Sequence, residues 1–192
     1  MGFSFDLTGR TALVTGASSG LGERFGRLLV QSGAQVALAA RRKDRLEALA
    51  AELGPAAAAI AMDVAREADV IAGYDAAEAA FGTVDTVIAN AGIDGQGAAT
   101  EMPEAEIEQT LAVNLKGAIL TAREGAKRMM AAGTTNGRIV LIASITAFEP
   151  SPGLVAYSAS KAGVVQAART LAREWARRGI SINTISPASC RR

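Results

Sequence analysis

The chain has 192 residues, of which 49% are hydrophobic and 20% are charged, and its formal net charge at pH 7 is +1. This length and apolar content exclude a disordered chain, and we expect residues 1–192 to form a single folded domain. The small net charge gives no electrostatic basis for binding nucleic acid or an anionic membrane surface, and no apolar run approaches the length of a membrane span.

The numbers of cysteine and histidine residues limit the possible cellular compartment and the possible chemistry of a site. The single cysteine, Cys190, excludes an internal disulfide, and the N-terminus has no basic start followed by an apolar run. We therefore expect a cytoplasmic protein. The chain contains no histidine, the commonest general base and metal ligand, and we predict no metal site.

Six short runs of apolar and small residues predict β-strands. The runs are nearly continuous rather than alternating, which is typical of strands covered on both faces of a sheet. They are TALVT (11–15), QVALAA (35–40), AAIAM (58–62), TVDTVIA (83–89), RIVLIAS (138–144) and SINTIS (181–186).

Helical patterns separate these runs. The first has apolar residues at helical spacing from Leu21 and stops before Gly33, and the second ends at the Gly-Pro pair at 54–55. Strong helix formers fill 66–81, 104–132 and 156–178. The alternation predicts an α/β fold with a parallel sheet, right-handed crossovers and helices on both faces.

Ligands of such sheets bind outside the carboxyl ends of the strands. Unusual polar and glycine residues gather there, so we expect the site at this edge. In chain order they are Gly16, Arg41 and Arg42, Asp63, the triplet Asn90-Ala91-Gly92, Ser144 at the end of the fifth strand, and Pro187.

The stretch TGASSGLG (15–22) after the first strand fits two kinds of site. Its G-x-S-x-G spacing matches the elbow that presents a nucleophilic Ser18 in hydrolases, but no histidine is present to activate it, which leaves only a Ser-Lys dyad. The glycines also fit a loop that brings backbone N–H groups to a diphosphate at a helix N-terminus. We favour the diphosphate loop; a glycine-rich turn without a ligand is the remaining alternative.

Arg41 and Arg42 end the second strand, where an acidic residue would bind a ribose 2′-hydroxyl and an arginine suits a 2′-phosphate. Cations at the start of a helix are disfavoured by the helix dipole. The presence of two arginines there is therefore better explained by binding of a ligand than by simple solvation of their side chains. We therefore predict NADP(H) rather than NAD(H).

Three reactive side chains lie near the end of the fifth strand. Tyr157 and Lys161 are four residues apart and share one helix face, where the ammonium favours the phenolate form of the tyrosine. Ser144 can donate a hydrogen bond to a substrate carbonyl. Each has an ordinary structural explanation alone, but together with a dinucleotide loop they favour a catalytic site.

These motifs together resemble the short-chain dehydrogenase/reductases over residues 7–187, in the branch with T-G-x-x-x-G-x-G at the first turn. Thr15 to Gly22 match that loop, Asp63-Val64 resembles the pair that contacts adenine, and Asn90-Ala91-Gly92 resembles the N-A-G motif. The catalytic tetrad is matched in order and spacing by Asn114, Ser144, Tyr157 and Lys161. The most similar kinds of member are bacterial 3-oxoacyl-thioester reductases and sugar-acid or polyol dehydrogenases.

The resemblance implies an α/β, Rossmann-like doubly wound parallel sheet of six strands in the order 3-2-1-4-5-6. It also implies a reaction that interconverts a ketone and a secondary alcohol by hydride transfer. Tyr157 would give or take the proton, Ser144 would orient the carbonyl, Lys161 would hold the nicotinamide ribose, and Asn114 would position a water. The cofactor-binding residues expected on these grounds are Gly16, Ser18, Ser19, Gly20, Leu21, Gly22, Arg41, Arg42, Asp63, Val64, Asn90, Ala91, Gly92, Tyr157, Lys161 and Pro187. The substrate would be bound largely by residues 145–156 and by the segment after Asn90.

The chain departs from the family pattern after SINTISP. Ala188 stands where the family has glycine, and the ending ASCRR (188–192) has no periodicity. From this we expect the chain to lack the usual last strand and substrate lid, and a homodimer whose assembly into a tetramer is weakened. Two hypotheses remain: an active carbonyl reductase, or a truncated, catalytically impaired protein of the same fold that binds a nucleotide or associates with a homologous subunit.

Overall fold

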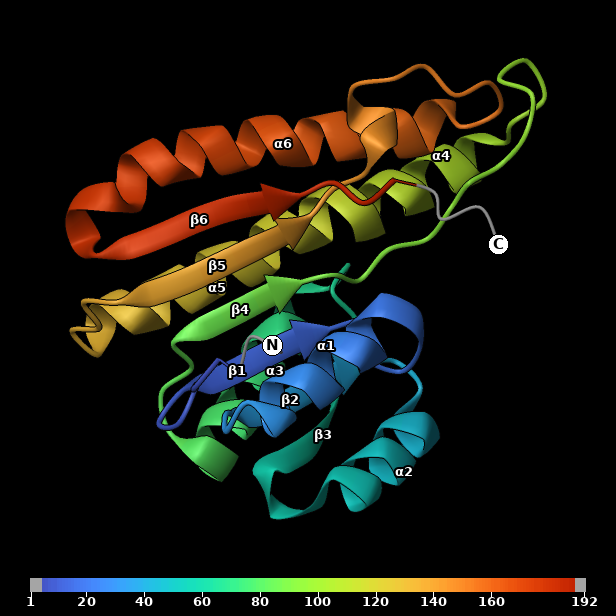
Figure 1. Ribbon diagram of the computed structural model, residues 1–192. Coiled ribbons are helices and arrows are strands. Elements are labelled where there is room, and N and C mark those ends of the chain that lie inside the picture. Colours follow the sequence, from blue (N-terminus) through green and yellow to red (C-terminus); the bar gives the residue numbers. More distant parts are fainter. Residues whose placement is uncertain (1–4, 189–192) are drawn as a thin grey trace, which may run out of the picture.

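The computed structural model describes residues 5–188, in which six parallel strands form one sheet with helices on both faces (Figure 1). The strand order is β3-β2-β1-β4-β5-β6, so the predicted fold class and strand order are confirmed. The strands are β1 (Thr11–Thr15), β2 (Gln35–Ala40), β3 (Ala57–Ala61), β4 (Thr86–Ala89), β5 (Gly137–Ile142) and β6 (Ile180–Ile185).

β3 and β6 are shifted by one residue from the predicted ranges, and two other strands differ from the prediction by more than that. β4 begins at Thr86 rather than at 83, because a bend at Gly82 and Thr83 connects the preceding helix to the sheet. β5 ends at Ile142, so Ser144 is not the last residue of the strand. Instead the Ser144 Oγ accepts a hydrogen bond from the Thr146 backbone N–H (3.2 Å) and caps a single 3₁₀ turn, Ile145–Ala147.

The helices are α1 (Gly20–Gln31), α2 (Lys43–Leu53), α3 (Glu67–Phe81), α4 (Glu104–Leu111), α5 (Gly117–Ala131) and α6 (Val155–Trp175). The prediction of a single helix over 104–132 is wrong in one respect, because a π-helical segment, Ala112–Lys116, separates α4 from α5. Such segments are frequent at functional sites, and this one contains Asn114. None of the helices that the structure describes is long and apolar enough to cross a membrane.

Two apolar cores lie on opposite faces of the sheet, because successive strand residues point to opposite sides. Val14 and Leu38 belong to the core under α1 and α2, whereas Leu13 belongs to the larger core on the side of α3, α5 and α6. All these side chains are fully buried.

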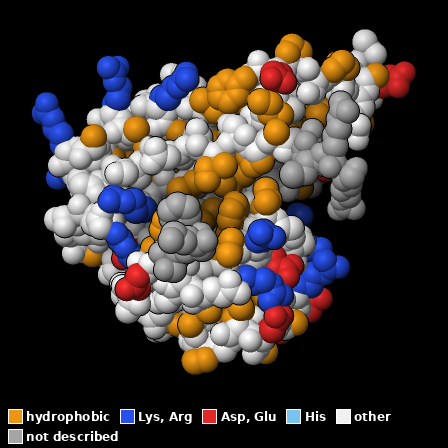
Figure 2. Space-filling model, viewed as in Figure 1, with side chains coloured by type: hydrophobic (Ala, Val, Ile, Leu, Met, Phe, Trp, Pro, Cys, Tyr) orange, Lys and Arg blue, Asp and Glu red, His pale blue; other side chains and the backbone are white. Residues whose placement is uncertain are grey.

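The strand β6 departs from the expected two-sided burial. Ile180 and Ile182 are buried against the α6 side, while Ser181 and Asn183 are exposed on the other face. Among the described residues, α1 and α2 cover the β1–β3 half of this face, and no helix lies in front of β5 and β6 (Figure 1). Hydrophobic side chains are exposed at the centre of the same face (Figure 2).

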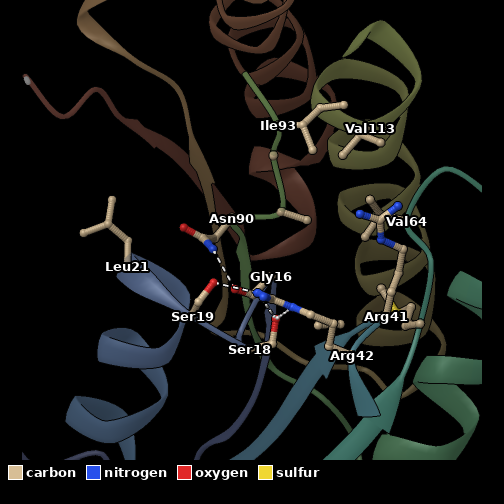
Figure 3. A pocket seen from close by; sticks show the side chains of 14 residues that line it. Gly16, Ser18, Ser19, Leu21, Arg41, Arg42, Val64, Asn90, Ile93 and Val113 are labelled. Carbon is tan, nitrogen blue, oxygen red and sulfur yellow. Dashed lines mark hydrogen bonds between the residues drawn. The ribbon is translucent and has the colours of Figure 1, made fainter. Parts of the chain in front are cut away.

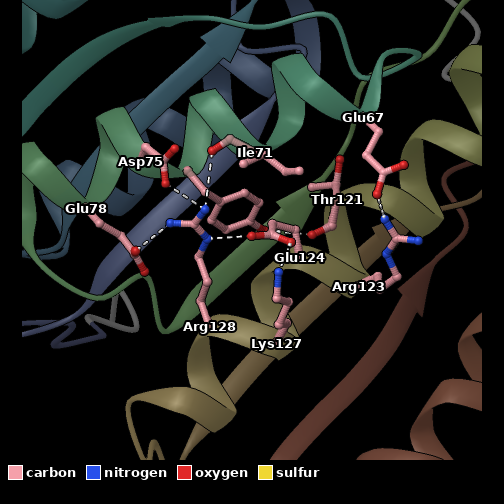
Figure 4. Close-up of polar contacts among 10 residues, drawn as sticks. Glu67, Ile71, Asp75, Glu78, Thr121, Arg123, Glu124, Lys127 and Arg128 are labelled. Atoms are coloured by element: carbon pink, nitrogen blue, oxygen red, sulfur yellow. Dashed lines mark hydrogen bonds and ion pairs between the residues drawn. The ribbon is translucent and has the colours of Figure 1, made fainter.

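A charged cluster joins α3 to α5 (Figure 4). The Arg128 guanidinium forms ion pairs of 2.7–2.8 Å with three carboxylates, those of Asp75, Glu78 and Glu124. It also lies 5.5 Å from the ring centroid of Tyr74, a fully buried residue whose phenol pKa is raised by burial. These contacts hold α5, and with it the π segment, against the sheet side that carries α3.

Candidate active site

The loop between β1 and α1 is packed so closely that two of its residues must be glycine. A Cβ on Gly16, whose φ is 68°, would lie 2.8 Å from the Ala91 Cα. A Cβ on Gly22 would lie 2.3 Å from the Gly16 carbonyl oxygen and 2.6 Å from the Asn90 Nδ2. The first and third glycines therefore bring the loop, the start of α1 and the end of β4 into direct contact.

Thr15 joins the ends of β1 and β4 and was not among the predicted site residues. Its Oγ1 accepts hydrogen bonds of 3.0 Å from the backbone N–H groups of Asn90 and Ala91, and the Asn90 Nδ2 donates to its carbonyl oxygen (3.0 Å). The signal that could have identified it was its place as the first residue of the TGASSGLG motif.

A first pocket of about 440 Å³ lies above this loop (Figure 3). Ten of the predicted cofactor-binding residues line it: Gly16, Ser18, Ser19, Leu21, Arg41, Arg42, Val64, Asn90, Ala91 and Gly92. Four apolar residues that the sequence analysis missed complete its walls: Ala40, Met62, Ile93 and Val113. None of the four belongs to a sequence motif, so their place in the pocket follows only from the fold.

Six predicted cofactor residues do not line this pocket, and three of them, Gly20, Gly22 and Asp63, do not line the second pocket described below either. Gly20 begins α1, and Gly22 lies beneath the loop against the Gly16 carbonyl. The Asp63 carboxylate accepts a hydrogen bond from the Ala65 backbone N–H (3.0 Å), which holds the turn after β3.

Arg42 is held against the loop serines. Its guanidinium donates hydrogen bonds to the Ser18 Oγ (2.9 and 3.2 Å) and to the Ser19 Oγ (2.8 Å). Arg41 extends away from these serines, in the direction of Val64 in Figure 3. No carboxylate lines the first pocket within the described part of the chain.

A second pocket of about 660 Å³ lies next to the first. The two share the lining residues Leu21, Asn90, Gly92 and Ile93, so they meet at the segment that follows β4. The second pocket brings together four predicted residues, Ser144, Tyr157, Lys161 and Pro187. The Pro187 carbonyl accepts a hydrogen bond from the Ile145 N–H (3.1 Å), which ties the segment after β6 to this wall.

Lys161 is the buried cation of the second pocket. It is 4% exposed, its Nζ donates to the Ile142 carbonyl oxygen (2.8 Å), and it lies 5.6 Å from the Tyr157 ring centroid. Burial lowers the pKa of Lys161 from 10.5 to about 8, because an ammonium loses hydration there. The amine therefore exchanges its proton at a pH close to neutral.

Asn114 lies outside both pockets and is 1% exposed. Its Oδ1 accepts from the Ile93 N–H and its Nδ2 donates to the Ile93 carbonyl, both at 2.8 Å, and the Nδ2 also donates to the Ser160 Oγ (3.2 Å). A Cβ on Gly92 would lie 3.4 Å from the Asn114 Oδ1 and 3.6 Å from the Lys161 Nζ. The side chain thus anchors the backbone that passes between the two pockets, next to the buried amine.

The fold and the residues at the carboxyl edge of the sheet define a class of protein. It is a Rossmann-like domain with a glycine-rich loop after the first strand and a Tyr-Lys pair beside it. The family model described as short chain dehydrogenase matches residues 10–191, and the chain belongs to this family. The predicted family membership is confirmed.

Two curated relatives and one solved structure illustrate the similarity. D-threitol dehydrogenase of Mycolicibacterium smegmatis is 42% identical over 188 residues, which cover 96% of this chain and 72% of the relative. Nodulation protein G of Rhizobium sp. is 40% identical over 183 residues, covering 95% and 74%. The crystal structure of 3-ketoacyl-(acyl-carrier-protein) reductase from Brucella melitensis, complexed with NADH, matches with a TM-score of 0.92 and 35% identity, covering 96% of this chain and 77% of that one.

The chain thus spans about three quarters of the length of these relatives. Residues 189–192 of the atypical ending noted in the sequence lie outside the described residues. Ala188, the first residue of that ending, lines the second pocket.

Proposed function

We propose that this chain is an NADP(H)-dependent oxidoreductase that interconverts a ketone and a secondary alcohol. The observation that carries the proposal is the adjacency of the two pockets, which share Asn90, Gly92 and Ile93. A molecule held at the glycine loop would lie beside the pocket that contains Ser144 and Tyr157. We favour this function over the catalytically impaired alternative, because all four tetrad side chains are present and the family is one of dehydrogenases.

The residues of the first pocket fit a dinucleotide. The close approach at Gly16 and Gly22 leaves the backbone at the start of α1 accessible, and nothing lies within 4 Å of a Cβ position on Gly20. Backbone N–H groups at a helix N-terminus bind phosphate oxygens well. The apolar residues Met62, Val64 and Val113 supply a wall of the kind that an adenine ring contacts.

Each side chain of the second pocket has its own role in the proposed reaction. A bound nicotinamide supplies or accepts the hydride. The Tyr157 hydroxyl gives the proton to the carbonyl oxygen during reduction and takes it back during oxidation. The Ser144 hydroxyl already accepts a bond from the Thr146 N–H, so its own proton is directed to another acceptor, which we assign to the substrate carbonyl. The Lys161 amine, with its lowered pKa, can relay a proton between the tyrosine and solvent.

Four donor groups of the first pocket support a preference for NADP(H). Arg41, Arg42, Ser18 and Ser19 line it, and none of its lining residues is acidic. A guanidinium that already bridges two hydroxyls forms a ready site for a phosphate, since charge-assisted bonds to phosphate are strong. An NAD(H)-specific site would need a carboxylate for the ribose 2′-hydroxyl at this place.

We also propose a homodimer that forms through α5 and α6. An exposed groove of about 430 Å³ runs between these helices, with walls that include Leu115, Ile119 and Leu171. Exposed apolar grooves of this kind are frequent at interfaces between subunits. Sedimentation velocity of the wild type and of a Leu171→Glu variant tests it; a monomeric wild type contradicts the dimer.

The reaction is tested by following NADPH oxidation with a panel of ketones and 3-oxoacyl thioesters. We expect turnover with at least one of them, and a loss of about 10²- to 10⁴-fold in kcat in Tyr157→Phe, because the proton donor is removed. NADPH binding, measured by calorimetry, should persist in the variant. Nucleotide binding without turnover in the wild type would favour the impaired alternative, and full activity of Tyr157→Phe would contradict the tyrosine assignment.

A further inference from the structure

The charge of the second pocket points to a substrate class. Of the residues that line it, two are charged, Asp94 and Lys161. The ammonium of Lys161 is buried and bonded to the Ile142 carbonyl, and the proposed reaction uses it beside Tyr157. No arginine lines this pocket in the described part of the chain. A carboxylate or phosphate on the substrate would therefore find no free cation there and would be repelled by Asp94.

Asp94 is available to a ligand. It is exposed, and no ion pair or hydrogen bond engages its carboxylate within residues 5–188. An ionised carboxylate is an acceptor with two oxygens, and hydroxyl groups are donors that match it. Vicinal hydroxyls can each donate to one of these oxygens.

The same pocket is lined by hydroxyl side chains, those of Ser144, Ser151 and Tyr157. A hydroxyl both donates and accepts hydrogen bonds, so these groups match the hydroxyls of a ligand.

Asp94 is held in place on both sides. Immediately before it, Ile93 is bound through its N–H and its carbonyl by Asn114. Three residues beyond it, the Gly97 N–H donates to the Gly153 carbonyl (2.9 Å). This bond joins the loop after β4 to the loop before α6, and the two loops lie side by side in Figure 1. The carboxylate is thus presented by an anchored segment, which suits a residue that selects a ligand.

We propose that the substrate is a neutral polyhydroxylated compound, a polyol or its hydroxyketone, and that Asp94 selects it by accepting hydrogen bonds from its hydroxyl groups. The proposal rests on the proposed function for the identity of the reacting carbon. It adds the substrate class and a specificity-determining residue outside the tetrad.

Calorimetric binding of three five-carbon probes tests it: xylitol, xylonate and 2-pentanol. The titrations are made without cofactor and with NADPH, with which an alcohol cannot react, so binding is measured whether or not the enzyme turns over. We expect the wild type to bind xylitol at least about tenfold more tightly than the other two, because hydrogen bonds to a charged acceptor are worth that much. Asp94→Asn should lose about tenfold in xylitol affinity and bind xylonate more tightly than the wild type does.

Glu101→Gln is the matched control, since Glu101 is an exposed carboxylate of the same loop that lines neither pocket. It should bind all three probes as the wild type does. Equal affinities for xylitol and xylonate in the wild type, no binding of xylitol, or an unchanged Asp94→Asn variant would each overturn the proposal. Xylitol binding without any turnover would count against the proposed function and leave the role of Asp94 standing.

Discussion

The two pockets at the carboxyl edge of the sheet are built in different ways. The first is lined mainly by strand ends and by a glycine loop whose backbone is packed against its neighbours, with Gly16 in the lining and Gly22 directly beneath it. The second is larger and is lined largely by connecting segments, including the loop that contains Asp94 and the residues before α6. Backbone packed this closely tolerates little change, whereas side chains on loops can vary without disturbing the sheet. This difference suits a pocket for a common cofactor beside a pocket that adapts to one substrate.

The largest effect is expected where the first pocket is tightest. In Gly22→Ala the new Cβ meets the Gly16 carbonyl at 2.3 Å, and backbone on one side or the other must move. We expect a loss of about 3 kcal/mol in the free energy of unfolding and of detectable NADPH binding in calorimetry. Urea denaturation measures the first quantity.

Gly97→Ala, at a loop of the second pocket where nothing lies within 4 Å of the Cβ position, is its control. It should leave both measurements close to those of the wild type. Equal effects of the two substitutions would contradict the contrast between a backbone-built and a loop-built pocket.

An effect on stability of similar size, but dependent on pH and without loss of the fold around the loop, is expected at Lys161. Its pKa of about 8 in the folded chain is below the ordinary 10.5, so between these values the unfolded chain binds more protons than the folded one. Stability therefore rises with pH across this window, and the burial of the ammonium costs roughly 3 kcal/mol below it. Lys161→Met removes this titration. The variant should be inactive. In the absence of cofactor it should be more stable than the wild type at pH 7 and should lose this advantage near pH 10.5.

Urea denaturation at both pH values measures the difference. Lys116→Met, which replaces an exposed lysine, should show the same stability relative to wild type at both pH values. A Lys161→Met difference that does not change with pH would refute a strongly lowered amine pKa.

The smallest effect is expected at the arginines of the first pocket. Replacing Arg41 and Arg42 together by alanine should lower the preference for NADPH over NADH by about 10- to 100-fold, because the charged donors for a 2′-phosphate are removed. The ratio of kcat/KM values for the two cofactors measures it, with Arg45→Ala, an exposed arginine of α2 outside both pockets, as the control. An unchanged ratio would remove the support for NADP(H) and leave NAD(H) as the cofactor.

Much of the fold could be predicted because the local pattern and the tertiary environment agree. β1 and β2 match the expected ranges residue for residue, since both strands are covered on two faces and read as continuous apolar runs. The π segment at Ala112–Lys116 could not be predicted. It lies in a stretch of strong helix formers, and the partner of its Asn114 is the backbone of Ile93, 21 residues earlier in the chain.

The sequence alone determined the succession of strands and helices along the chain, the family and the side chains with reactive groups, because periodicity, glycine spacing and the Tyr157–Lys161 interval are local properties of the chain. Only the tertiary structure decided how these groups meet. Burial sets the pKa of Lys161, Arg42 bonds to serines more than twenty residues away, and the Ile145 N–H donates to the Pro187 carbonyl. Each of these depends on desolvation or on contacts between distant segments, and such terms exist only once the sheet has brought its strand ends to one edge.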